Sequence, residues 1–180
     1  MKILVLGPKR SGKDALAELL NKHFEMTFKS SSEMANEIFI YDELKSKYGY
    51  SSLEECFEDR HNHRQEWYLM ICGYNMEDKA RLSKDIIAHH DCYVGMRDLE
   101  EFESSKDLFD VIIWVDASKR IVDGDSTNKI SKEVAHIVVT NNGTFEEFES
   151  KSKVIGNILF NLIPNEVIPS NFFKLNNLNL

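Results

Sequence analysis

A glycine-rich stretch near the start of the chain carries the residue types that bind phosphate groups. Residues 7–14 read GPKRSGKD and match the pattern GxxxxGK, known as Walker A. Glycines let the backbone curl so that successive N–H groups point at phosphate oxygens, and Lys13 can reach the outer phosphates. We predict a nucleotide-phosphate site here, and a purely structural strand-to-helix turn is the alternative. The expected nucleotide-binding residues are Gly7, Lys9, Arg10, Ser11, Gly12, Lys13, Asp14 and Ala15, with Asn142 and Gly143 from a later turn.

Asp14 is the candidate metal ligand. It stands where the pattern expects Ser or Thr, whose hydroxyl binds Mg²⁺. A carboxylate is also a hard oxygen ligand, so Asp14 can keep this role directly or through a metal-bound water. The alternative is that Asp14 only stabilises the N-terminus of the helix that follows.

Further cations occur at three other places in the chain. Transfer of a phosphoryl group requires charge neutralisation on both donor and acceptor, so cations are needed beyond one lysine. Arg60 and Arg64 are four residues apart, which puts both on one helix face. Arg97 follows an expected buried strand, and Lys119 and Arg120 open a polar loop. We interpret Arg60 and Arg64 as acceptor-binding, Arg97 as facing the ligand, and Arg120 as carried on a closing lid.

Each of these interpretations has an alternative. Arg60 and Arg64 can instead form salt bridges with nearby acids, namely Glu54, Glu55, Glu58 or Asp59. The loop after residue 117 can be merely solvated. Trp67 and Tyr68 can stack on a base or belong to a core, and the turn at residues 141–143 can approach an adenine or serve only as a turn. The histidines at 61, 63, 89 and 90 lack the spacing of a zinc site.

Elements that would position these residues alternate between strand and helix. Apolar runs predict strands at residues 3–6, 26–28, 92–94, 111–115 and 137–139, with helical periodicity between them. This order predicts an α/β fold with a five-stranded parallel sheet and helices on both faces, in which ligands bind at the carboxyl ends of the strands. Ser30 to Ser32 suit a helix N-cap at one such end, and Ser31 joins the expected substrate-binding residues.

The domain organisation follows from the same pattern. We expect one domain over residues 1–163, with a core of residues 1–29, 80–117 and 133–163. Residues 30–79 form a helical insert rich in charged and aromatic residues. Residues 118–132 are expected to be a mobile lid with almost nothing to bury, and residues 164–180 form an Asn-rich tail.

Composition narrows the class of partner. The 180 residues carry a net charge of −8, which argues against a protein that grips a nucleic-acid polymer, because that affinity comes mostly from Lys and Arg. The three cysteines are odd in number and widely spaced, so we expect reduced core thiols. No window approaches the roughly 18 to 20 apolar residues of a membrane span, and a cytoplasmic location is expected.

Three stretches resemble the P-loop nucleoside monophosphate kinases, most closely the phage-type deoxynucleoside monophosphate kinases. They are GPKRSGKD at 7–14, FEDRHNHRQEWY at 57–68, and YVGMRDLEEF at 93–102 followed by VIIWVDASKR at 111–120 and TNNGTFEEF at 140–148. The resemblance implies a P-loop NTPase fold with a helical NMP-binding insert and a short lid. It further implies transfer of the ATP γ-phosphate to a nucleotide monophosphate with Mg²⁺, in the cytoplasm, that of the host if the chain is phage-encoded.

Residue roles implied by the resemblance are specific. Lys13 contacts the donor phosphates, and Arg64 and Arg97 lie on the acceptor side. We therefore expect Lys13, Arg97 and Arg120 as catalytic residues, and Ser31, Arg60, Arg64, Trp67 and Arg97 as substrate-binding residues. The expected partners are small nucleotides, and the oligomeric state stays open, a homodimer included.

Two other functions stay open. One is a kinase whose acceptor is a hydroxyl, as in the dephospho-CoA kinases, which share the NNGTFEEF ending in looser form. That reaction needs a base, for which Asp91 or Asp116 are the candidates. The other is a nucleotide-binding protein without catalysis, which the missing Ser or Thr at position 14 favours.

Overall fold

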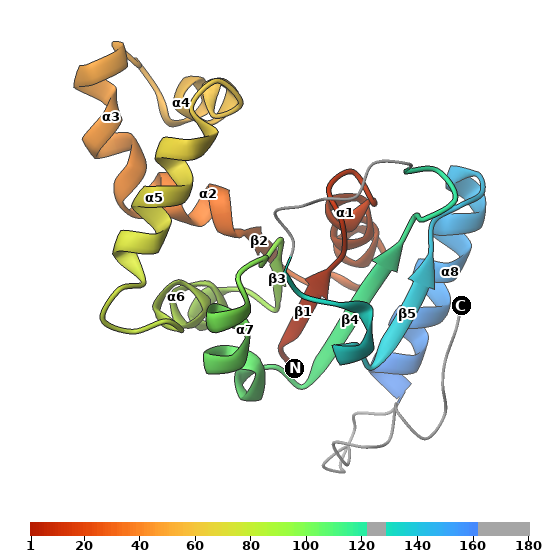
Figure 1. Cartoon of the computed structure of the whole chain (residues 1–180). Coiled ribbons are helices and arrows are strands. Elements are labelled where there is room, and N and C mark those ends of the chain that lie inside the picture. Colours follow the sequence, from red (N-terminus) through yellow and green to blue (C-terminus); the bar gives the residue numbers. More distant parts are fainter. Residues whose placement is uncertain (122–128, 162–180) are drawn as a thin grey trace.

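A computed structural model describes residues 1–121 and 129–161 of the chain. Five parallel strands form one sheet in the order β2-β3-β1-β4-β5 (Figure 1). Their bounds are Ile3–Leu6 for β1, Phe28–Ser30 for β2, Cys92–Val94 for β3, Val111–Asp116 for β4 and Ile137–Thr140 for β5. The predicted α/β class and five-stranded parallel sheet are confirmed.

Alternation along the strands divides the core into two layers. Ile3 and Val5 of β1 point to one face of the sheet, where α1 (Lys13–Phe24) and α8 (Phe145–Asn161) pack together. Leu4 and Leu6 point to the other face, which α6 (Arg81–His89) and α7 (Leu99–Ser105) cover. Because both faces are buried, the strands read as continuous apolar runs in the sequence. Helices on both faces, as predicted, are confirmed.

The segment between β2 and α6 folds into helices with a core of its own. It contains α2 (Ser31–Ala35), a π-helical turn (Asn36–Ile40), α3 (Tyr41–Tyr48), α4 (Leu53–Asp59) and α5 (Arg64–Tyr74). Six buried residues hold these helices together: Ala35, Ile40, Leu44, Tyr50, Cys56 and Trp67. Figure 1 shows α3, α4 and α5 standing apart from the sheet. We call this segment the insert.

The second strand differs from its predicted position. It spans Phe28–Ser30, two residues later than the apolar run at 26–28, because Phe28 pairs with Cys92 and Ser30 with Val94. Met26 is instead buried beneath the sheet edge. The predicted N-cap is confirmed, since Ser30 Oγ accepts from Glu33 N at 3.2 Å and the Glu33 carboxylate accepts from Ser30 N at 3.0 Å.

The expected lid is only partly described. Residues 122–128 lie outside the described residues, as does the predicted tail at 164–180. The expectation that 118–132 buries almost nothing is wrong at Ile130, which is 4% exposed and packs with the α6 and α7 side of the core.

One further expectation, on the cysteines, needs correction. In α8, Phe148, Ile155 and Leu159 fill the contact with the sheet, whereas Phe145 and Val154 are 59% and 44% exposed. All three cysteines are free, but only Cys56 and Cys92 are buried, and Cys72 is half-buried. Within residues 1–121 and 129–161, none of the helices combines the length and apolar character that a bilayer crossing requires.

Candidate functional site

The glycine loop, residues 7–14, joins the central strand β1 to α1. Its backbone takes positive φ angles at three positions, Gly7 (144°), Arg10 (63°) and Gly12 (99°). Such angles are the ordinary territory of glycine and are uncommon for arginine. The loop therefore has the curled backbone that the sequence predicts.

Close neighbours explain why two of these positions must be glycine. A Cβ atom added to Gly7 would lie 2.6 Å from the carbonyl oxygen of Val115. One added to Gly12 would lie 2.3 Å from Nδ2 of Asn141. Since real Cβ atoms essentially never approach so closely, the ends of β4 and β5 press directly against the loop.

Two polar side chains are buried in the glycine loop. Lys13 is 6% exposed, and its ammonium group donates to the carbonyl oxygen of Pro8 at 2.7 Å, so it folds back over the loop. The Ser11 side chain is fully buried, and among the described residues its hydroxyl finds no hydrogen-bond partner. A buried hydroxyl without a partner carries a desolvation cost, which a ligand oxygen in the loop would remove.

Residues at the ends of β4 and β5 hold the loop from outside. Asn141 Nδ2 donates to the carbonyl oxygen of Ser11 at 2.8 Å, and the backbone N–H of Asn141 donates to the Asp116 carbonyl at 2.7 Å. Arg120 donates through Nε to the Asn141 carbonyl at 2.5 Å, and its Nη2 lies 3.5 Å from the Ser11 carbonyl. The predicted Arg120 thus lies beside the glycine loop.

The turn after β5, residues 141–143, contributes structural contacts from its two asparagines. Asn142 Oδ1 accepts from the backbone N–H of Lys119 at 2.9 Å, and Gly143 is exposed. Asn141, absent from the predicted nucleotide-binding residues, is the member of the turn that contacts the glycine loop. Its position directly after a buried strand was the available signal, but an Asn-Asn-Gly turn explained it equally well.

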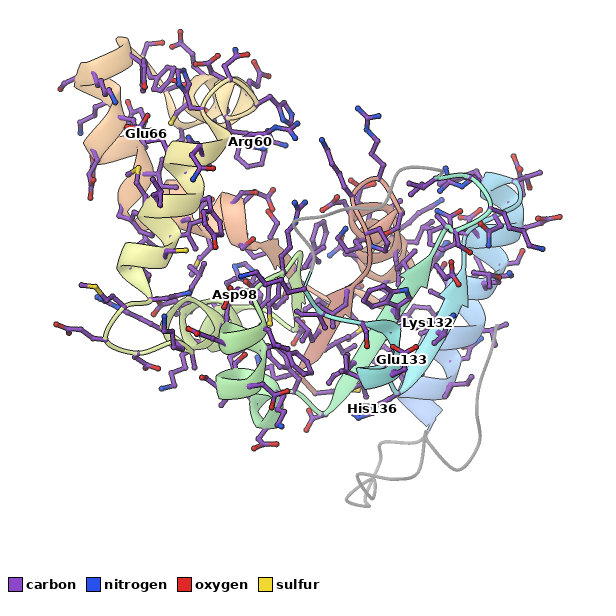
Figure 2. The ribbon with its side chains drawn as sticks, viewed as in Figure 1. Arg60, Glu66, Asp98, Lys132, Glu133 and His136 are labelled. Carbon is purple, nitrogen blue, oxygen red and sulfur yellow. The ribbon has the colours of Figure 1, made fainter. Side chains whose placement is uncertain are left out.

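Arg60 faces the glycine loop from the insert. It is half-buried, stacks 3.7 Å above the Phe57 ring centroid and donates to the Phe57 carbonyl at 2.6 Å. Burial lowers the pKa of Arg60, the negative charges of Glu33 and Asp14 act against this, and the charge of Arg64 adds to it. Asp14 belongs to α1, so the Arg60 guanidinium lies within electrostatic reach of the helix that follows the loop. Figure 2 shows Arg60 on the side of the insert that faces the sheet.

Arg64 and His61 form a second contact on the same turn. Nη2 of Arg64 lies 3.2 Å from Nδ1 of His61, and both side chains are exposed. Nearby positive charges lower the pKa of His61, with Arg60 contributing most, then burial, then Arg64 and Lys9. Lys9 is part of the glycine loop, so cations of the loop and of the insert share one region. Within the part of the chain that the structure describes, neither arginine forms a salt bridge with the acids that were the alternative partners, Glu54, Glu55, Glu58 and Asp59.

Trp67 does not present a stacking face. It is 4% exposed and lies in the core of the insert, 6.3 Å from the Phe57 ring centroid. The expectation that Trp67 binds substrate is therefore wrong, because its ring fills the interior of the insert. Tyr68, on the next position of α5, is 48% exposed.

Ser31 and Arg97 lie near the carboxyl ends of the neighbouring strands β2 and β3. A Cβ on Gly95 would lie 3.8 Å from Ser31 Oγ, so the two exit segments are adjacent. Arg97 is exposed, and its carbonyl accepts from the Lys129 backbone at 3.1 Å. Asp98 then caps α7 by accepting from the N–H groups of Glu100 and Glu101.

A buried polar network under this edge was not anticipated from the sequence. Glu101 is 6% exposed, and Oε1 accepts from Ser83 at 3.1 Å and from the Tyr93 hydroxyl at 2.9 Å. Burial raises the pKa of Glu101 to about 7, although the two hydrogen bonds act in the opposite direction. Tyr93 also interacts with Ser31, so the network reaches the exit of β2. A glutamate beside exposed acids on a short helix gives no signal of burial in the sequence.

The candidate carboxylates lie at opposite ends of the parallel strands. Asp14 is exposed on the first turn of α1, and Asp116 ends β4 beside the glycine loop. Burial raises the pKa of Asp116, but hydrogen bonds from Ser118 outweigh it and the pKa is lowered. Asp91 precedes β3, at the amino end of that strand, and accepts hydrogen bonds from Thr27. The expectation that Asp91 could act as a base in this site is therefore wrong. Among the described residues, no three His, Cys, Asp or Glu side chains gather as a metal-binding group.

Phosphate and Mg²⁺ place different demands on these residues. The curled loop, Lys13 and the unpaired Ser11 hydroxyl suit phosphate oxygens. Mg²⁺ is usually held by one or two carboxylates together with substrate phosphates and waters, and Asp14 meets that demand.

The chain was also compared with known proteins. Neither the models of known protein families nor the curated protein sequences contain a significant match to it.

Proposed function

We propose that the protein transfers the γ-phosphate of ATP to a nucleoside or deoxynucleoside monophosphate. One observation carries the proposal: charged residues of the glycine loop and of the insert lie within electrostatic reach of each other. The charge of Asp14 acts on Arg60, and that of Lys9 acts on His61 beside Arg60 and Arg64. A reaction between two phosphorylated substrates needs such an arrangement on both sides.

On the donor side, the glycine loop holds the triphosphate. Its N–H groups and the N-terminus of α1 attract phosphate oxygens, and Lys13 turns from the Pro8 carbonyl to a phosphate oxygen. Ser11 supplies a hydroxyl hydrogen bond inside the loop. Arg120, already fastened to Asn141, contributes positive charge beside the loop. Mg²⁺, held by Asp14 with phosphates and water, would supply further charge neutralisation when bound.

On the acceptor side, Arg60, Arg64 and Arg97 bind the monophosphate and hold it in line. The acceptor phosphate is already ionised near neutral pH, so no general base is required. Catalysis then consists of positioning and charge stabilisation, which these residues supply without a proton transfer.

A substrate panel tests the proposal. The protein is incubated with ATP and Mg²⁺ and one acceptor at a time: AMP, GMP, CMP, UMP, dAMP, dGMP, dCMP, dTMP and dephospho-CoA. Formation of a diphosphate from at least one monophosphate is the expected result. Transfer to dephospho-CoA alone would favour a hydroxyl kinase, in which Asp116 is the candidate base.

A thermal-shift series completes the test. Any ligand that binds the folded state raises the melting temperature. Stabilisation by ATP that is indifferent to Mg²⁺, with no transfer to any acceptor, would contradict the kinase and favour a non-catalytic nucleotide-binding protein.

A further inference from the structure

His61 lies among the positively charged side chains of the candidate site, but its own imidazole carries no charge in the neutral state. It belongs to the turn at residues 60–63, between α4 and α5, which backbone bonds fix: Asn62 N donates to Asp59 O at 2.9 Å and His63 N to Arg60 O at 3.3 Å. The positive charges that act on His61 come from Arg60 and Arg64 on the insert and from Lys9 on the glycine loop. The exposed imidazole is thus held in a cationic environment from two elements.

The contact with Arg64 fixes the chemistry of the imidazole. Arginine has five N–H donors and no acceptor, so Nη2 of Arg64 must donate across the 3.2 Å to Nδ1 of His61. Nδ1 can accept only when it carries no proton, which makes the imidazole neutral with its proton on Nε2. The surrounding positive charge favours the same neutral form.

A phosphate bound in this region would change both the charge around His61 and its hydrogen bond with Arg64. Its negative charge offsets that of Arg60, Arg64 and Lys9, so the imidazole binds a proton at a higher pH than in the free protein. Once Nδ1 is protonated it can no longer accept from Arg64. The guanidinium is then released and can direct both of its N–H edges to phosphate oxygens.

We propose that His61 is a phosphate-binding residue of the acceptor site that takes up a proton as the monophosphate binds, releasing Arg64 to the ligand. This proposal rests on the proposed function, since it assigns a residue to the same site. The proton comes from the solvent and goes to Nδ1, the Arg64–His61 hydrogen bond breaks, and hydrogen bonds from Arg64 and His61 to the phosphate form. The net change is one proton bound per occupied site when the imidazole is fully titrated.

Calorimetry measures this proton directly. The eight nucleoside and deoxynucleoside monophosphates of the substrate panel and inorganic pyrophosphate are each titrated into the protein between pH 6 and 8, in PIPES and in imidazole buffer, whose ionisation enthalpies differ. The dependence of the binding heat on the buffer gives the number of protons taken up. The ligand phosphates also titrate near pH 6, so the quantity of interest is the difference between the wild type and His61→Asn, in which the ligand contribution cancels.

Asn is chosen because its Oδ1 can accept from Arg64 but does not titrate. The expected result is an uptake of up to about one proton in the wild type that His61→Asn lacks, with a wild-type affinity that falls by up to about tenfold per pH unit over the pH range in which the uptake occurs. The matched control is His63→Asn. His63 lies two residues away but pairs with Asp59 at 2.9 Å and packs against Tyr48, so this variant should keep the uptake.

Four outcomes would overturn the inference. Equal proton uptake in the wild type and His61→Asn would mean that another group titrates, and loss of the uptake only in His63→Asn would move it to that residue. Binding without buffer-dependent heat would remove the proton step while leaving the proposed kinase function intact. No binding of any of these ligands would overturn the function together with the inference.

Discussion

The glycine loop and the turn that carries Arg60 and Arg64 face each other, yet they are built differently. The loop is surrounded: Val115 and Asn141 press against its glycines, Lys13 and Ser11 are buried, and Asn141 and Arg120 contact its backbone. The turn rests on the insert's small core, and Arg64 and His61 are exposed. The loop thus has one geometry fixed by the sheet, whereas the turn keeps side chains that can still rearrange around a ligand.

This difference separates two kinds of mutational effect. Substitutions in the loop should disturb both folding and phosphate binding, because the same atoms serve both. Substitutions in the turn should change ligand affinity with little effect on stability. Three of the four predictions below test this separation, and the one on Glu101 tests the buried support beneath the site. They run from the largest expected effect to the smallest.

Lys13→Ala should reduce phosphoryl transfer by about 10²- to 10³-fold, the usual cost of removing one donor to developing charge. The control is Lys22→Ala on the same helix, whose exposed ammonium pairs with Glu149 at 2.9 Å and should leave the rate unchanged. Transfer rates and thermal unfolding are measured for both. Full activity in Lys13→Ala would contradict the proposed donor site.

Glu101→Gln tests the buried support beneath Ser31. The pKa of Glu101 is raised to about 7 from 4.5, so its proton stabilises the fold below pH 4.5 and this contribution is lost as the pH rises through about 7. The difference of about 2.5 between the pKa values corresponds to roughly 3 kcal/mol. The unfolding free energy of the wild type should therefore fall relative to Glu101→Gln by that order between pH 4.5 and 8, measured by urea unfolding.

The exposed neighbour Glu103 supplies the control for this pH series. It pairs with Lys106 on the surface, so Glu103→Gln should follow the wild-type pH profile. A wild-type curve parallel to that of Glu101→Gln would show that the buried carboxyl does not titrate in this range.

Gly12→Ala should lower the unfolding free energy by about 2 kcal/mol, because it combines a positive φ with a clash against Asn141. Gly73→Ala is the matched control: it lies in helix α5 with open space around it, and should stabilise the protein by up to about 1 kcal/mol. Denaturant unfolding measures both. Equal stabilities would mean that the loop is not constrained by the end of β5.

Arg64→Ala should raise the KM for the acceptor about tenfold, a loss of about 1.4 kcal/mol, while the KM for ATP and the melting temperature stay unchanged. Lys47→Ala, which removes a surface pair with Glu66 elsewhere on the insert, is the control. A higher KM for ATP instead would place the turn on the donor side and end the distinction between the two regions.

Much of the fold was predictable because the chain buries its strands on both faces. Continuous apolar runs at β1, β3, β4 and β5 located four strands nearly to the residue, since no alternation is possible where both faces are covered. The edge strand β2 was displaced because its residues are set by pairing with β3 rather than by their own apolar character. Propensity alone could not give that register.

The candidate site was predictable only where the spacing of residues in the sequence indicates the backbone conformation. The glycines and Lys13 follow a short-range pattern, so their arrangement could be inferred. The contact between Asn141 and Ser11 joins residues 130 positions apart. The burial of Trp67 and Glu101 likewise depends on which helices pack together, and a single sequence carries little information on such contacts.

The position of β1 in the centre of the sheet has a consequence for how the protein folds. β1 pairs with β3 and β4, whose residues come about 90 and 110 positions later, and the glycine loop touches a residue later still. Contacts so distant in sequence are slow to form. We therefore expect the loop to acquire its final curvature only when β5 has docked, so that nucleotide binding during refolding would report completion of the whole sheet.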